Sequence, residues 1–175
     1  MKKWLSTLLI VAIGFTYVSS AAAQDIGSGS AQQGTTITIP SIKIVRTTGG
    51  SVSFDSNDIS ASAFGDDGVF TTTKSDVTSL VTIHNYENTN QKVTVQWAND
   101  APDGFGTSAG NHQLAVRADD NAFATVASGS ASDVVSGIAA GASTFSIDYQ
   151  LTVDAQAGQV SNATNDLTFT MTADN

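Results

Sequence analysis

The sequence predicts an all-β fold, a sandwich of mostly antiparallel strands. Apolar and polar residues alternate in several short runs, and the longest clean run covers residues 144–154. Segments rich in Gly, Asn, Asp and Ser separate these runs, as turns do between strands. No window has the 3.6-residue apolar period of an amphipathic helix. Together these observations indicate seven or more short strands.

The central element of the predicted fold is residues 79–99, which read as two strands joined by a polar, Asn-rich turn. The strand period of two places apolar side chains on one face and polar ones, including Thr82 and His84, on the other. The pattern therefore predicts a β-hairpin, which needs further strands to cover its apolar face. The side chains expected in the core are Val81, Ile83, Val93, Val95 and Trp97.

Residues 1–23 have the pattern of a secretory signal peptide. Lys2 and Lys3 precede an apolar run, and small residues before Gln24 predict cleavage after Ala23. A permanent transmembrane helix is disfavoured because polar residues interrupt the short run. We expect a secreted or cell-surface protein with a flexible N-terminal arm at 24–34 and one sandwich domain at 35–175. The arm is either a frayed terminus or a segment that orders against a neighbouring molecule.

The charge balance excludes several partners. Without Lys2 and Lys3, five basic residues face sixteen acidic ones, a net charge of −11. Such a surface repels nucleic acids and anionic membranes. The chain has no cysteine, so disulfides, thiolate catalysis and thiolate metal sites are excluded.

The remaining strands are expected at intervals along the chain. Residues 35–48 are strand-like, but Pro40 makes them an edge strand, a bulge or two short strands. A looser segment at 55–68 and loops at 99–110 and 155–165 separate the other runs. Those other expected strands are 51–54, 69–73, 113–118, 122–127, 133–138, 144–154 and 166–173.

Catalytic patterns are missing from the sequence. His84 and His112 do not form a zinc-binding motif, and no serine lies in a nucleophile elbow. Glu87 is the only glutamate, and the aspartates lie mostly in turns, where they cap backbone N–H groups. We therefore expect a protein that is not an enzyme and has no obligatory cofactor.

Calcium is the one ion that the composition favours. Oxygen-rich loop clusters flanked by glycine suit a hard cation, although their spacing is not that of an EF-hand. The candidate ligands are Asp100, Asp103, Asp119, Asp120 and Asn121. Separately, Asn162 lies in a short N-glycosylation pattern.

A family resemblance rests on the order of the strand patterns after the N-terminal segment. The residues that carry it are Val81, Ile83 and Asn85; Val93, Val95 and Trp97; Gly141, Ser143, Ile147, Tyr149, Leu151, Val153 and Asp154; and Leu167, Phe169, Met171 and Ala173. In this order the chain resembles the camelysin/TasA-like secreted proteins and their archaeal pilus relatives. Camelysin is classed as a metallopeptidase, but no zinc motif is present here, and that activity is not carried over.

The resemblance implies an Ig-like or jelly-roll sandwich that polymerises head to tail. In such filaments an N-terminal segment of one subunit adds as a strand to the next. Here the implied donor is residues 24–39, with Ile26, Ile37 and Ile39 as its buried side chains. The expected function is a structural subunit of a pilus or biofilm-type fibre, with itself as partner. The alternatives are a secreted module that binds sugar or calcium, and a hydrolase with a dispersed site.

Overall fold

The computed structural model describes residues 36, 38, 42–84 and 89–175, and its strands lie in the unit Ile39–Asn175. The predicted signal peptide and arm lie outside the described residues. The strands are β1 (Lys43–Gly49), β2 (Val69–His84), β3 (Gln91–Trp97), β4 (Gln113–Ala118), β5 (Ala124–Thr125), β6 (Ser132–Ile138), β7 (Gly141–Asp154) and β8 (Leu167–Ala173). Two 3₁₀ turns complete the list, η1 (Ala61–Ala63) and η2 (Ala155–Ala157).

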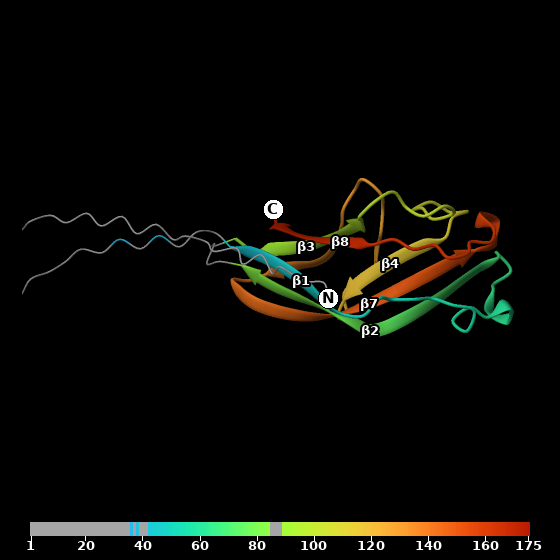
Figure 1. The fold of residues 1–175 in the computed structure, drawn as a ribbon, viewed down its shortest axis with the longest axis horizontal. Helices are drawn as coiled ribbons and strands as arrows, with labels where there is room; N and C mark the ends of the chain where they lie inside the picture. Colours follow the sequence, from blue (N-terminus) through green and yellow to red (C-terminus); the bar gives the residue numbers. More distant parts are fainter. Residues whose placement is uncertain (1–35, 37, 39–41, 85–88) are drawn as a thin grey trace, which may run out of the picture. The chain divides into compact units, whose positions relative to one another are not determined.

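The strands form two antiparallel sheets, which pack as two layers (Figure 1). Sheet A has the order β1-β2-β7-β4-β5, and sheet B has the order β6-β3-β8. The predicted all-β sandwich is therefore confirmed. Its Ig-like or jelly-roll connectivity stays a prediction.

The predicted hairpin at 79–99 is wrong in its pairing. β2 pairs with β1 and β7 in sheet A, whereas β3 pairs with β6 and β8 in sheet B. The chain thus crosses from one sheet to the other between His84 and Gln91. Sheets in a sandwich lie about 10 Å apart, a distance that six residues span easily. We call this end of the sandwich the crossover end.

The predicted inward face of β2 is also wrong. Thr78, Leu80, Thr82 and His84 are buried, while Val81 and Ile83 are only partly buried. Leu80 is fully buried and belongs to the core cluster, so alternation sends its odd-numbered neighbours to the outer face. The inward polar groups find partners inside, as when the Thr78 hydroxyl bonds the Tyr149 hydroxyl at 2.8 Å.

The core lies between the two sheets, and its other rows match the sequence pattern. Val93, Val95 and Trp97 of β3 are buried, as predicted. From β7, Ile147, Tyr149 and Leu151 are buried in phase. The side chains of Leu167, Phe169 and Met171 on β8 pack against this core but remain partly exposed.

Strand β2 is one long strand instead of the predicted 69–73 and a separate later one. Its register against β7 shifts between Lys74 and Thr78, which marks a bulge that lets it bend. Asp76 has a left-handed φ of 55° there. The predicted strand at 51–54 is wrong: that segment is not a strand, although Val52 and Phe54 pack against the core.

Candidate functional site: an open side of the sandwich

Strand β8 is an edge strand of sheet B. It pairs with β3 over seven consecutive residues without a register shift, and no described strand pairs with its other side. Its sequence, LTFTMTA, has no charge, Gly or Pro, the devices that usually protect an edge. Because alternate N–H and C=O groups of an edge strand point away from its one neighbour, β8 can pair with another strand.

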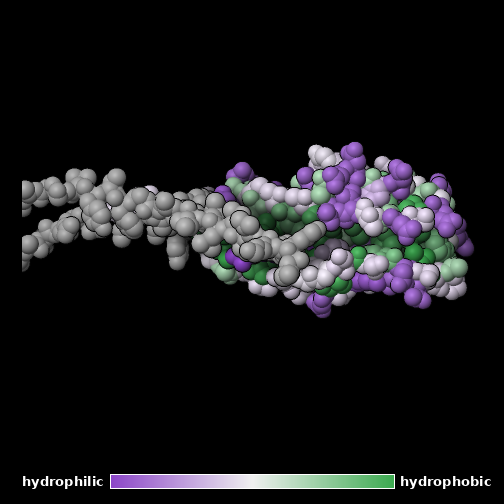
Figure 2. All heavy atoms as spheres, viewed as in Figure 1, coloured by the Kyte–Doolittle hydropathy of each residue, from purple (hydrophilic) through white to green (hydrophobic). Residues whose placement is uncertain are grey.

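The edge of sheet A on the same side is β1, and a hollow separates it from β8. The hollow has a volume of about 120 Å³ and is bordered by Val45, Arg46, Thr47, Leu167 and Phe169. Figure 2 shows hydrophobic residues along the hollow between the two layers. The hollow is open to solvent, and its volume is sufficient for about one branched aliphatic side chain.

The opposite side of the sandwich is closed. There β5 has only two residues, and the Ser132 hydroxyl of β6 donates to the Thr125 carbonyl of β5 at 2.7 Å, which links the two sheets. β6 has register shifts against β3, and Asp133 on it pairs with Lys92. Short strands, bulges and charges all discourage further pairing. Strand β8 has none of these features.

Sequence reasoning missed this site because it treated Leu167, Phe169 and Met171 only as core residues. The signal that could have found it is the composition of β8, whose inward residues are large and apolar and whose outward residues are three threonines. The predicted donor residues Ile26, Ile37 and Ile39 lie outside the described residues. Their role stays a prediction.

The predicted calcium ligands lie in two loops at opposite ends of β4. The Asp119 carboxylate accepts the Ser146 N–H at 2.7 Å, and the Asn121 amide donates to the Ala118 carbonyl at 2.8 Å. Asp100 and Asp103 lie in the loop before β4, where the Asp100 carbonyl accepts from Asn165. Within residues 42–84 and 89–175, no three acidic, His or Cys side chains gather as a metal site would need. Calcium binding stays a prediction.

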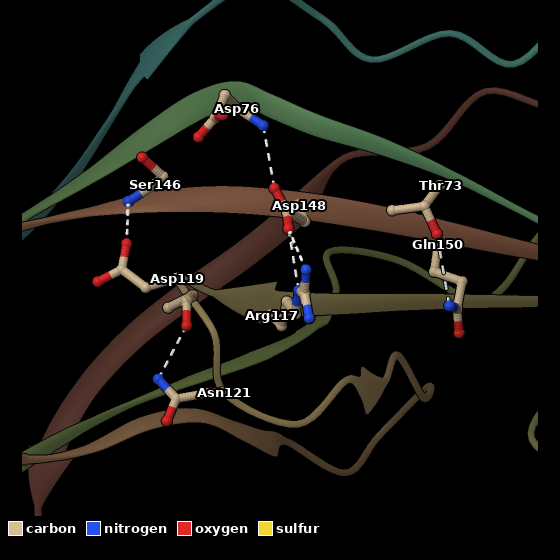
Figure 3. A network of polar contacts seen from close by, with 9 residues as sticks. Thr73, Asp76, Arg117, Asp119, Asn121, Ser146, Asp148 and Gln150 are labelled. Atoms are coloured by element: carbon tan, nitrogen blue, oxygen red, sulfur yellow. Dashed lines mark hydrogen bonds and ion pairs between the residues drawn. The ribbon is translucent and has the colours of Figure 1, made fainter.

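Asp119 and Asp120 border a polar hollow of about 480 Å³ on the outer face of sheet A. Within it the Asp148 carboxylate holds the β2 bulge, because it accepts the Asp76 N–H at 3.0 Å (Figure 3). The same carboxylate pairs with Arg117 at 2.8 Å. Burial alone would raise the pKa of Asp148, but the Asp76 N–H and Arg117 outweigh it and hold the pKa below its usual value.

We expect Asp148→Asn to lower the free energy of unfolding by roughly 1–3 kcal/mol at pH 7, because Arg117 loses its charged partner. A lowered pKa means that the carboxylate stabilises the fold above its unfolded pKa of about 4 and stops doing so as the pH falls through the lowered value. Urea unfolding at pH 7 and in acid measures both effects, and the difference between the proteins should shrink in acid. Asp133→Asn is the control: that side chain is 54% exposed, against 9% for Asp148, so about 0–1 kcal/mol is expected. Equal losses would contradict this role for Asp148.

Both histidines are structural in the described part of the chain. His84, predicted on the polar face, is instead buried, and its Nε2 bonds the Ala139 carbonyl. His112, predicted in a loop, is also buried, with both ring nitrogens bonded to backbone groups. Asn162 is exposed in the loop before β8, and its glycosylation stays a prediction.

The described residues define a class, a two-sheet β-sandwich in which the edge strand β8 contains no charge, Gly or Pro. No protein-family model, curated protein or solved structure matches the chain. No helix among the described residues is long and apolar enough to cross a bilayer.

Proposed function

We propose that this protein is a secreted structural subunit that polymerises by strand addition, as a pilus or biofilm-type fibre does. The observation that supports it is the edge of β8, with which no described strand pairs on its outer side, next to the hollow between β1 and β8. A strand from another copy would pair with β8 through main-chain hydrogen bonds, and its inward side chains would fill the hollow.

The donor in this proposal is the segment before β1, whose sequence at 35–40 is TTITIP. Ile37 and Ile39 are two residues apart, so in a strand they lie on one face and can contact Leu167 and Phe169 together. Each copy has one donor and one acceptor at different places, and repeated head-to-tail addition of this kind forms a fibre.

The test is negative-stain electron microscopy of the chain purified after full-length expression, at high concentration, with and without calcium. We expect filaments from the natural chain and none from the double variant Ile37→Asp/Ile39→Asp, because charged side chains cannot enter the hollow without a large desolvation cost. A natural chain that stays monomeric throughout would overturn the proposal. A difference between the calcium arms would decide whether the aspartate loops take part.

A further inference from the structure

The outer face of sheet A carries an aliphatic patch at the crossover end. Ile44 of β1 lies directly opposite Ile83 of β2, and Val81 lies on the same face. None of the three packs against the core. Ile42, next to β1, is 43% exposed. No other large hydrophobic side chain among the described residues is as exposed. We call Ile42, Ile44, Val81 and Ile83 the outer patch.

The rest of this outer face is polar, as expected of a sheet face in water. Thr71 and Thr152 bond each other through their hydroxyls, and Gln150 bonds Thr73. Where β2 reaches the crossover end, however, its outer face has the aliphatic residues Val81 and Ile83, while its inner face has Leu80, Thr82 and His84. A cluster of aliphatic side chains on an otherwise polar sheet face is typical of a surface that contacts another molecule.

We propose that a second copy of this chain covers the outer patch. This inference rests on the proposed function, because the donor segment joins β1 at Ile42, within the patch itself. A copy that accepts the donor must therefore lie beside the patch. In the accepting copy, too, the donor segment begins at the crossover end. Head-to-tail repetition therefore places the opposite end of the accepting copy next to the patch. That opposite end consists of the loops 55–68, 98–112 and 155–166.

The charges of the two surfaces are complementary. Arg46 lies on the same face as the patch, opposite Val81, and forms no ion pair with a carboxylate of the described residues. The three loops of the opposite end contain no Lys or Arg. Their acidic residues outside the core are Asp55, Asp58, Asp66, Asp67, Asp100, Asp103 and Asp166. Asp58 pairs with Lys74, and the other six carboxylates leave this end acidic. An acidic loop end and a patch beside Arg46 attract each other and favour one orientation of docking.

Photo-crosslinking tests this contact directly. The full-length chain is expressed with p-benzoylphenylalanine in place of Ile42 or, as the control, in place of Thr73, which is exposed on the outer face of β2 away from the patch. We expect an adduct of twice the chain mass from position 42 and none from position 73. Peptide mapping should place the other end of the adduct in the acidic loops. No intermolecular adduct from position 42, or equal adducts from both positions, would overturn the inference.

Two variants connect the contact to assembly and separate the two proposals. Ile44→Thr/Ile83→Thr keeps β-branched residues but removes apolar area, and should raise the concentration needed for filaments about tenfold. Arg46→Gln should slow assembly several-fold at low ionic strength and little at high ionic strength. Filaments without the adduct would reject the outer-patch contact and leave strand addition standing. The adduct without filaments would reject the filament function and leave a pairwise contact.

Discussion

Phe169→Lys should abolish filament formation while leaving the sandwich folded. Phe169 borders the hollow and points inward from the free edge of β8, so a lysine there places a charge where the donor side chains would enter. Inward-pointing charges are a device by which natural edge strands prevent pairing. Burying a donor isoleucine is worth about 1.5–3 kcal/mol, and each 1.4 kcal/mol is a factor of ten. Losing one such contact should raise the critical concentration by a factor of about 10 to 100, which sedimentation of polymer measures.

The matched control for this variant is Thr170→Lys, which adds the same charge one residue further along on the outward face of β8. Thr170 is exposed, so this chain should still form filaments. Circular dichroism and thermal melting report whether each variant is folded, and Leu167→Lys repeats the test if Phe169→Lys is not. Filaments from a folded Phe169→Lys chain at the natural concentration would contradict the role of the hollow.

Mixing provides a sharper form of the same test. Phe169→Lys retains a donor but lacks an acceptor, whereas Ile37→Asp/Ile39→Asp retains an acceptor but lacks a donor. Strand addition predicts that each alone is monomeric and that the mixture forms a one-to-one dimer that grows no further. Analytical ultracentrifugation distinguishes this dimer from monomers and from polymer. A mixture that stays monomeric would reject strand addition between these two segments.

The positions of most strands could be predicted from local alternation, but their pairing could not. The pattern in 79–99 is the same whether its two strands pair in one sheet or belong to two, because both arrangements need a polar connection between apolar runs. The prediction of which face of β2 is buried was wrong for a related reason. Val81 and Ile83 are more apolar than Thr82 and His84, yet the burial of Leu80 decides the phase, and Leu80 lies opposite Phe145 of β7. Long-range register of this kind is not visible in a single strand.

The edge position of β8 could not be predicted from the sequence either. Whether Leu167 and Phe169 are core or edge residues depends on how many strands each sheet contains, which is a property of the whole chain. The loops in which calcium ligands were predicted show the converse. Asp119 does what its turn position predicts, since its carboxylate accepts a backbone N–H and holds the loop. Local chemistry was therefore readable, whereas anything that depended on strand order was not.

His112→Leu should cause a large loss of stability, because the imidazole contacts the end of β7, the loop after it and the loop before β4. These segments lie at the end of the sandwich opposite the crossover end. Its Nε2 donates to the Gly158 carbonyl at 2.9 Å, and its Nδ1 accepts the Asp154 N–H at 3.2 Å. The ring also meets Phe105 edge-on, and Phe105 in turn meets Trp97. Leucine fills much of the space but leaves a buried N–H and a carbonyl without partners, at roughly 1–3 kcal/mol each. We expect a loss of about 3–5 kcal/mol, or about 10 °C in Tm.

The control is His112→Gln, whose amide can donate and accept and should recover part of the loss. Urea unfolding compares the three chains, and hydrogen exchange of the Asp154 amide reports the bond itself, which should open more readily in the leucine variant. If glutamine and leucine cost the same, the ring contacts with Phe105 would be what stabilises this end. If neither variant costs more than about 0.5 kcal/mol, the value typical of a surface substitution, His112 does not hold the loops together. Because β8 follows the loop that His112 fastens, loss of this anchor should also lower the affinity of β8 for an added strand.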